Sequence, residues 1–161
     1  MSLAADLVAE LTARNLSVAV AESLTGGLLV AEFVAVPRAS LVVRGGVVAY
    51  ATDLKRSLLG VSAELLAAEG PVHPEVARQM AVGVRRMLSI DGIPAAIGLA
   101  TTGVAGPGPQ DGHPAGEAYV AIAMGDRVTV LHLHISGSRE DIRKAVVSES
   151  LSELAKLLHG G

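Results

Sequence analysis

Apolar residues recur at helical spacing near both ends of the chain. Residues 3–11 carry a leucine at every fourth position, and Asn15 follows, a residue that tolerates the left-handed conformation at a helix end. Ser138 precedes Asp141 by three residues, which is a variant of the capping box, and an apolar stripe continues from there to Gly160. The pattern therefore predicts an amphipathic helix at each end of the chain.

Three interior segments also carry helix signals. The segment that starts at Gly26 is typical of a buried helix, and Pro37 would terminate it. Asp53 is placed to cap a second, shorter helix. Pro74 suits a first helical turn, and the helix that it opens continues through Leu88. We therefore expect helices after the first and second predicted strands and a longer one before the third.

Short apolar or β-branched runs predict strands over Val18–Ala21, Val42–Ala51 and Ala95–Ala100. Two further runs flank Gly125-Asp126, and this spacing is typical of a β-hairpin. The central strands are apolar throughout, so helices should cover both faces of the sheet. We predict an α/β fold, a three-layer α/β/α sandwich with a mixed, mostly parallel sheet whose antiparallel part is the hairpin.

A chain of 161 residues has the length of one domain, and we assign all of residues 1–161 to it.

Its mean hydropathy of +0.49 raises the question of a membrane span. The longest uncharged stretch, Gly92 to Gln110, is interrupted by prolines and glycines and cannot hold a spanning helix. The amino end lacks the basic and apolar regions of a signal peptide. We therefore expect a cytoplasmic protein that does not contact a membrane.

Half of the residues are hydrophobic, only 2% are aromatic, and the net charge is −3. Proteins that bind single-stranded nucleic acid use aromatic platforms in a basic groove, so no direct nucleic-acid binding is expected. The chain has no cysteine, and its histidines lack the spacing of a helical metal pair, so no metal site is expected. The surplus of apolar residues indicates a sheet buried on both faces and a homo-oligomer, which we expect to be a dimer.

Chemistry is expected where strands end, because open α/β sheets bind ligands beyond the carboxyl ends of their strands. The first predicted strand is followed by Ser23, Thr25, Gly26 and Gly27. A serine hydroxyl near the start of a helix, beside backbone N–H groups that glycines leave accessible, suits a nucleophile with an oxyanion hole or a phosphate cradle. The same residues are equally typical of an ordinary helix cap.

The lysines offer a better base for this serine than the histidines do. Lys55 follows the strand that bears Tyr50 and lies among alanines and leucines, where burial would lower its pKa. A neutral lysine can accept the proton of a serine, which makes a Ser-Lys site for acyl transfer. The alternative is a surface lysine on a short helix beside Arg56.

The segment from Thr101 to Gly116 is the one long stretch without a predicted element, and such loops are usually functional. Its glycines and prolines leave backbone donors free to surround an anionic or planar ligand. It lacks the dinucleotide fingerprint and the P-loop sequence, so no cofactor is expected. We expect substrate to be bound by Thr102, Gly103, Ala105 and Gly106 of this segment and by Thr25, Gly26 and Gly27 of the turn after the first strand.

Arg139 and Arg143 lie one turn apart at the start of the last predicted helix. Two guanidinium groups in this arrangement could clamp the phosphate of a substrate. The alternative is that they pair with Glu140 or extend into solvent, which is the more common situation for surface arginines.

Four blocks of the sequence together resemble the CinA C-terminal domain family, the nicotinamide-nucleotide amidases called PncC. The blocks are AESLTGG (21–27), RGGVVAYATDLKRSLLGV (44–61), TGVAGPGP (102–109) and GSREDIR (137–143). They follow one another over nearly the whole chain. Their joint occurrence is specific, although each block alone is weak.

The resemblance implies an α/β/α sandwich and a cytoplasmic bacterial hydrolase that converts nicotinamide mononucleotide to nicotinate mononucleotide and ammonia in pyridine-nucleotide salvage. It implies that Ser23 is the nucleophile and that Tyr50 and Lys55 assist it. In this mechanism Ser23 attacks the carboxamide carbon while Lys55 or Tyr50 accepts its proton. Backbone N–H groups near residues 26–27 or 103–106 would hold the oxyanion.

The sequence departs from the family pattern in two places. Residues 114–117 read PAGE where the family often has PVGT, which introduces Glu117, and residues 70–73 read GPVH, which introduces His73, where the family often has GAVS. Both lie near segments expected to shape the pocket. They leave two alternatives open, a non-catalytic interaction module linked to competence or DNA damage and an amidase of broader specificity. The molybdopterin-binding-like domain of larger family members has no counterpart here, so we expect a stand-alone form or an excised domain.

Overall fold

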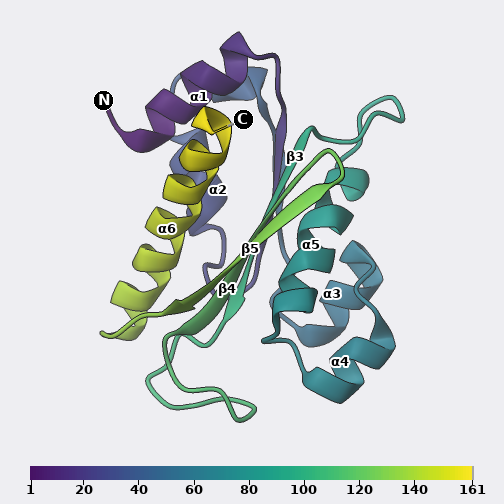
Figure 1. Ribbon diagram of the computed structural model, residues 1–161, viewed down its shortest axis with the longest axis vertical. Helices are drawn as coiled ribbons and strands as arrows, with labels where there is room; N and C mark the ends of the chain where they lie inside the picture. Colours follow the sequence, from purple (N-terminus) through teal and green to yellow (C-terminus); the bar gives the residue numbers. More distant parts are fainter. Residues whose placement is uncertain (161) are drawn as a thin grey trace.

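Helices and strands alternate along most of the chain, as the apolar pattern predicts. A computed structural model describes residues 1–160 (Figure 1). In chain order the elements are α1 (Leu3–Ala13), β1 (Val18–Glu22), α2 (Leu28–Val34), the 3₁₀ helix η1 (Ala39–Leu41), β2 (Val43–Val48), α3 (Thr52–Leu59), α4 (Ala63–Glu69), α5 (Pro74–Met87), β3 (Ile97–Gly103), β4 (Glu117–Met124), β5 (Arg127–His134) and α6 (Arg139–His159).

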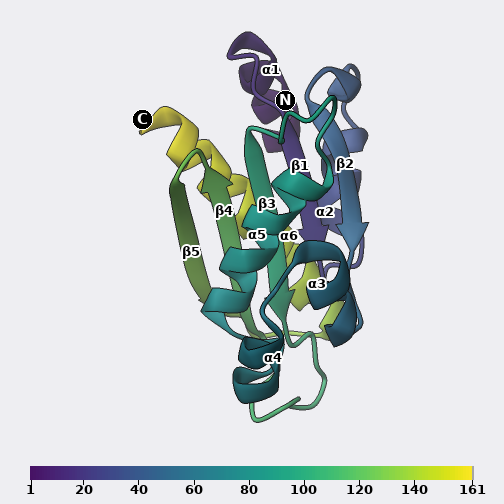
Figure 2. The same ribbon diagram turned by 90° about the vertical axis from the view of Figure 1, so that its right-hand side faces the viewer.

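The five strands form one mixed sheet in the order β2-β1-β3-β4-β5. Strand β1 pairs in parallel with β2 and β3, whereas the β3–β4 and β4–β5 pairs are antiparallel, so only β4 runs against the other strands. Helices α1, α2 and α6 cover one face of the sheet, and α3, α4 and α5 lie on the other (Figures 1 and 2). The predicted three-layer α/β/α sandwich is therefore confirmed, and the carboxyl ends of β1, β2 and β3 share one edge.

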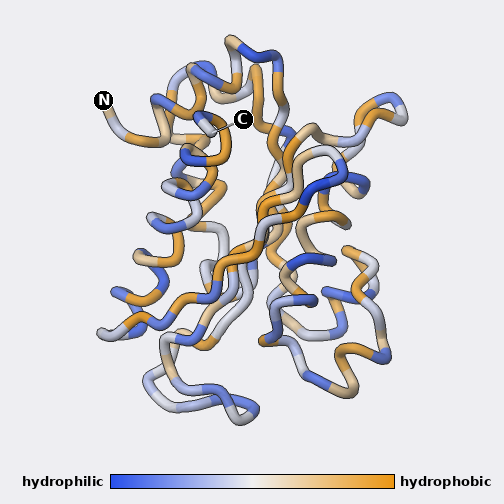
Figure 3. The backbone as a smooth tube through the Cα atoms, in the orientation of Figure 1, coloured by the Kyte–Doolittle hydropathy of each residue, from blue (hydrophilic) through white to orange (hydrophobic). Residues whose placement is uncertain are grey.

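Small side chains let the layers approach closely. The apolar positions are concentrated along the central strands and on the helix faces that cover them, whereas the loop between β3 and β4 is largely hydrophilic (Figure 3). A Cβ atom added at Gly83 would overlap the carbonyl oxygen of Leu59, and one added at Gly98 would overlap that of Ala81. Helix α5 therefore touches both α3 and β3 through backbone, which explains the prominence of glycine in a core with few aromatic rings.

Several local signals in the sequence correspond to observed features. Asn15 has a φ of 54° just after α1, and Pro74 occupies the first turn of α5. Ser138 and Asp141 form a reciprocal capping box at the start of α6. The predicted hairpin is the β4–β5 pair, which turns at residues 125–126. Turn and cap chemistry was therefore a good guide to element ends.

Two expectations about elements are wrong. Asp53 does not cap α3, because Ala51 is the N-cap residue and the Asp53 carboxylate instead accepts a hydrogen bond of 3.0 Å from Arg56 Nε. The segment 101–103 is not part of the loop. Its backbone continues the β3 ladder, in which Thr101 pairs with Glu22 on one side and with β4 on the other. The long connection therefore starts only at residue 104.

The sequence analysis missed helix α4 and the short helix η1. No residue of α4 is fully buried, and only Leu65 and Leu66 pack partly against the core, so its apolar signal is too short to reveal a helix. Within residues 1–160, none of the helices is both long and apolar enough to cross a membrane.

Replacing Gly83 by alanine tests the close packing of α5 against α3. Alanine is the better helix former by about 1 kcal/mol, yet the added methyl group has no room, so we expect the free energy of unfolding to fall by about 2 kcal/mol. Urea denaturation measures this change. Gly108→Ala is the matched control, because its Cβ would meet nothing within 4 Å. Equal stability of the two variants would contradict the packing argument.

Candidate functional site

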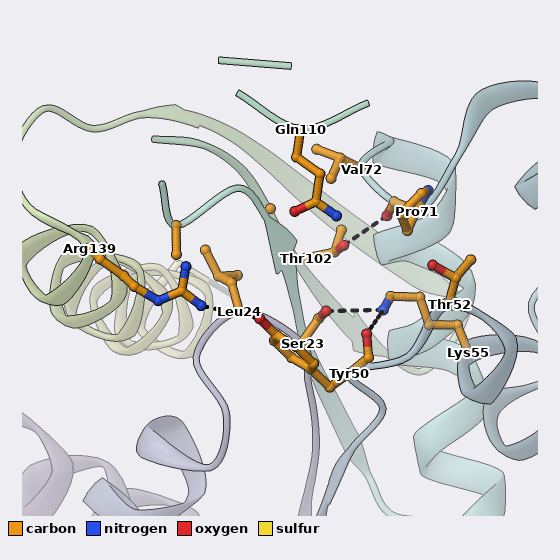
Figure 4. Close-up of a pocket in the computed structure, with 12 residues that line it drawn as sticks. Ser23, Leu24, Tyr50, Thr52, Lys55, Pro71, Val72, Thr102, Gln110 and Arg139 are labelled. Atoms are coloured by element: carbon orange, nitrogen blue, oxygen red, sulfur yellow. Dashed lines mark hydrogen bonds between the residues drawn. The ribbon is translucent and has the colours of Figure 1, made fainter. Parts of the chain in front are cut away.

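A small open cavity of about 80 Å³ lies beyond the carboxyl ends of β1 and β3 (Figure 4). Residues expected from the sequence line it, namely Ser23, Tyr50, Lys55, Thr102, Gly103, Ala105 and Arg139. Others were not expected, namely Leu24, Thr52, Pro71, Val72 and Gln110. The cavity therefore combines segments from the β1–α2 turn, α3, the loop before α5, the β3–β4 loop and α6.

The contact between Ser23 and Lys55 is the central feature of this cavity. Lys55 Nζ lies 3.0 Å from Ser23 Oγ, and both side chains are buried. The backbone N–H of Ser23 donates to the carbonyl of Thr101 at 3.0 Å, which extends the sheet one residue beyond β1. The serine is thereby fixed at the sheet edge, and the first turns of α3 bring the lysine to it.

Lys55 is buried with neutral partners only. Besides Ser23 Oγ, its amine donates to the carbonyl of Ala49 at 2.8 Å and to that of Tyr50 at 3.4 Å. Desolvation by burial lowers the pKa of Lys55 from 10.5 to about 8. In the neutral amine, two N–H groups can bond to the two carbonyls while the lone pair faces Ser23. The surroundings therefore accommodate both protonation states of the lysine.

The Tyr50 hydroxyl was expected to assist Ser23, but it contacts Arg139 instead. Its side chain is 60% exposed at the mouth, and its hydroxyl accepts a hydrogen bond of 3.1 Å from Arg139 Nη2. The part of Tyr50 that contacts Lys55 is the backbone carbonyl. The geometry thus favours Lys55 as the group that acts directly on Ser23, and it places the tyrosine hydroxyl beside the arginine.

The turn between β1 and α2 contains Thr25, Gly26 and Gly27, which support the site from outside the cavity. Thr25 Oγ1 is buried against Thr101 Oγ1 at 2.8 Å, and the N–H of Gly26 donates to the carbonyl of Ser23 at 3.1 Å. Gly26 and Gly27 have φ values of 59° and 103°, a region that favours glycine. None of the three lines the cavity, although all were expected to bind substrate. Their observed role is to form the turn that presents Ser23.

The two arginines of α6 have different surroundings. Arg143 donates from Nε to the carbonyl of Leu24 at 2.8 Å and from Nη2 to that of Thr25 at 3.1 Å, so it braces the turn and does not line the cavity. Arg139 does line the cavity, and its Nη1 donates to the carbonyl of Gly106 at 2.6 Å. Gly106 contributes this carbonyl without lining the cavity itself. Arg139 alone is therefore placed to meet a ligand.

Glu22 is a buried residue of the site that the sequence analysis missed. It is fully buried, with Oε1 accepting from the N–H of Leu29 at 2.8 Å and Oε2 from that of Val30 at 3.1 Å. The N-cap of α2 is Gly27, which has no side chain, so Glu22 takes over the capping function. The first turn of α2 is therefore capped by a side chain of the protein itself. An acidic residue at the end of an apolar strand was the available signal.

Thr102 links the two sides of the cavity. Its hydroxyl donates to the carbonyl of Pro71 at 2.7 Å, which ties β3 to the segment that precedes α5. His73, one of the departures from the family pattern, caps α5 by accepting the N–H of Glu75 at Nδ1 over 3.1 Å. The GPVH segment thus has a structural explanation in helix capping.

Comparisons with known proteins agree on one family. The model of the family described as CinA C-terminal domain matches residues 1–158. A CinA-like protein of Frankia casuarinae is 45% identical over 150 residues, or 93% of this chain and 34% of that protein. A CinA-like protein of Gemmatimonas aurantiaca is 40% identical over 155 residues, or 96% of this chain and 35% of that protein. The chain thus spans about a third of the length of these curated relatives.

Solved structures show the same likeness. The competence-damaged protein (CinA) superfamily protein from Klebsiella pneumoniae superposes with a TM-score of 0.92 at 29% identity, covering 99% of this chain and 97% of that one. The competence/damage inducible protein CihA from Agrobacterium tumefaciens gives a TM-score of 0.89 at 34% identity, covering 96% and 93%.

Glu22→Gln tests the capping of α2. The amide keeps the shape of the side chain but turns one acceptor into a donor that faces a backbone N–H, so we expect a loss of about 2 kcal/mol in the free energy of unfolding. Chemical denaturation measures it. Glu32→Gln is the control on the exposed face of the same helix and should change stability by less than about 0.5 kcal/mol. Similar losses in both variants would show that Glu22 does not cap the helix.

Proposed function

Because the chain belongs to the CinA C-terminal domain family, we propose that it is an amidohydrolase that converts nicotinamide mononucleotide to nicotinate mononucleotide and ammonia. The observation that carries the proposal is the buried contact of 3.0 Å between Ser23 Oγ and Lys55 Nζ at an open cavity beyond the carboxyl ends of the strands. A Ser-Lys pair of this kind supplies a nucleophile and its proton acceptor together. The same cavity has a guanidinium group at its mouth for an anionic substrate.

Lys55 serves as the general base in this proposal. A pKa of about 8 leaves a usable fraction of neutral amine near neutral pH, which an ordinary surface lysine would not have. The two carbonyls of residues 49 and 50 orient the amine so that its lone pair faces the serine hydroxyl. Tyr50 assists by its carbonyl and by holding Arg139, since its hydroxyl is bonded there.

The reaction proceeds in two stages that share one proton carrier. Ser23 Oγ attacks the carboxamide carbon as its proton passes to Lys55 Nζ, and the resulting ammonium then gives that proton to the departing nitrogen, so the C–N bond breaks and ammonia leaves. Water attacks the acyl-serine ester, Lys55 accepts a proton from that water, and the proton returns to Ser23 Oγ as nicotinate mononucleotide is released. No cofactor is required for any of these steps.

The negative charge that develops on the carbonyl oxygen needs backbone donors. The N–H of Gly26 is bonded to Ser23, and that of Val104 is bonded to the carbonyl of Glu117. Leu24 and Ala105 belong to the same two segments and line the cavity. We assign the binding of the oxyanion to the backbone N–H groups of Leu24 and Ala105, because such donors are effective when they are fixed before the reaction.

The buried lysine argues against the alternative of an interaction module without catalysis. Burying an amine without a counter-charge lowers stability, and a surface that only binds a partner gains nothing from it. A broader amidase would share the Ser-Lys chemistry. Such an amidase would not need a group that binds the phosphate of a nucleotide. Arg139 is therefore the residue that distinguishes a nucleotide-specific amidase from a broader one.

Substitution of the Ser-Lys pair tests the chemistry. Ser23→Ala and Lys55→Ala should each lower kcat for nicotinamide mononucleotide by about a thousandfold or more, and Lys55→Arg should do the same because arginine does not lose its proton. Ammonia release measures the rate. The wild-type kcat/KM should rise with pH and level off above about 8, since only the unprotonated amine accepts the serine proton.

Lys144→Ala is the control for this series, because Lys144 is an exposed lysine of α6 that pairs with Glu140 and does not line this cavity. It should retain wild-type activity. Near-normal turnover in Ser23→Ala or in Lys55→Arg would remove the assignment of nucleophile and base.

Arg139→Ala tests recognition of the phosphate. Loss of a charge-assisted contact should raise KM for nicotinamide mononucleotide by about 10- to 100-fold. Nicotinamide riboside lacks the phosphate, so its kcat/KM should be nearly the same in wild type and variant. Arg143→Ala, which removes a brace of the turn, should lower both kcat values alike. An Arg139→Ala enzyme that still prefers the nucleotide to the riboside by the wild-type ratio would refute the assignment.

A further inference from the structure

The loop between β3 and β4 carries a tight turn at its tip, and the two arms of this turn have different neighbours. Gln110 and His113 exchange two backbone hydrogen bonds of 2.9 Å. Asp111 and Gly112 between them have φ values of 50° and 81°, which a two-residue hairpin turn requires. Gln110 lines the cavity, and Figure 4 shows its side-chain amide directed toward the interior. Because the two arms are paired, a shift of His113 also shifts Gln110.

His113 is bound to a cluster of side chains outside the cavity, which we call the Glu117 cluster (His113, Glu117, Tyr119 and His132). His113 Nδ1 lies 2.9 Å from Glu117 Oε2, and His132 Nε2 lies 2.9 Å from Oε1. The Tyr119 hydroxyl donates to Oε1 at 3.2 Å. One carboxylate thus joins the loop to both strands of the hairpin.

Burial and stacking hold the side chains of the Glu117 cluster in place. The Glu117 side chain is only 11% exposed, and the rings of Tyr119 and His132 stack with centroids 4.4 Å apart. Burial raises the pKa of Glu117, but hydrogen bonds from His113, His132 and Tyr119 outweigh it and hold this pKa below its usual value. The carboxylate is therefore ionised at neutral pH and can accept from all three donors.

The base of the loop is held independently of this cluster. The N–H of Gly116 donates to the carbonyl of Val104 at 2.8 Å, and the N–H of Ile135 donates to that of Gly116 at 2.9 Å. A variant that loses the Glu117 contacts should therefore keep the sheet and the loop base while its tip moves more freely.

We infer that Glu117 is a positioning residue for the cavity: by holding His113 it fixes Gln110 as a hydrogen-bonding group on the outer wall. Glu117 and its donors touch no ligand themselves. The amide of Gln110 offers both a donor and an acceptor, so the ligand class that it serves is a polar small molecule that can bond to both. The inference rests on the proposed function only for the identity of that molecule.

Glu117→Gln in the full chain tests this inference by two measurements. Hydrogen exchange followed by mass spectrometry, without substrate, should show the bonded backbone amides of the loop tip, those of Gln110 and His113, exchanging about tenfold faster than in the wild type, because the side-chain amide that replaces the carboxylate cannot accept from all three donors. With nicotinamide mononucleotide, KM should rise about tenfold while kcat stays within about twofold. Glu149→Gln, on the exposed face of α6, is the control and should change neither.

Substitutions of the histidines separate positioning from general loss of structure. Asparagine places a donor near the site of histidine Nδ1, and glutamine places one near Nε2, so His113→Asn and His132→Gln should keep slow exchange in the loop and a low KM. His113→Ala should reproduce the Glu117→Gln behaviour.

The outcomes are distinct. Loop exchange in Glu117→Gln that equals that of the control overturns the inference, whatever the substrate is. Faster exchange with an unchanged KM overturns the positioning role. A wild-type protein that does not hydrolyse nicotinamide mononucleotide, combined with fast loop exchange in Glu117→Gln and rescue by His113→Asn, overturns the proposed function and supports the fastening of the loop.

Discussion

Burial of the Lys55 amine without a counter-ion is the constraint on which the arrangement of the site depends. An ammonium group taken out of water needs hydrogen-bond acceptors, and here they are the carbonyls of residues 49 and 50 and the hydroxyl of Ser23. Strand β2 ends at Val48, which leaves the carbonyls of the next two residues free to accept from the amine. The N–H of Ala49 remains bonded to Glu22, which keeps this segment beside the end of β1. The connection between β2 and α3 thus supplies the acceptors that the buried amine needs.

Ser23 is the partner of Lys55 in this contact. Its position depends on side chains that do not line the cavity, namely Glu22 and Arg143. Glu22 fixes the start of α2 from one face of the sheet, and Arg143 holds the carbonyls of the turn from α6. Both neutralise backbone dipoles that would otherwise compete for Ser23 or for a ligand. Partners outside the cavity therefore hold the turn that carries Ser23, which keeps its hydroxyl at a fixed place beside Lys55.

The sequence predicted the layers of the fold and the pairing of Ser23 with Lys55, because these depend on local patterns, on strand ends and on a family resemblance. It missed Glu22 and Gln110 and placed Arg143 at the substrate. These errors share a cause, since the role of each residue is set by partners that the local pattern does not show, such as the contact between Arg143 and Leu24 across 119 positions. Helix α4 was missed because it packs only two half-buried leucines against the core, and residues 101–103 were assigned to a loop because threonine and glycine there conceal a continuing strand.

The direction of β4 has a consequence for how such a protein diverges. Because β4 runs antiparallel to β3, the chain returns to the sheet at the edge where it left it, and the connection needs no crossover helix. The segment 104–116 therefore does not have to cross from one end of the sheet to the other. Its length and composition can change without a change in strand order. One loop and its anchor at the start of β4 can thus be exchanged while Ser23 after β1 and Lys55 on α3 keep their contact.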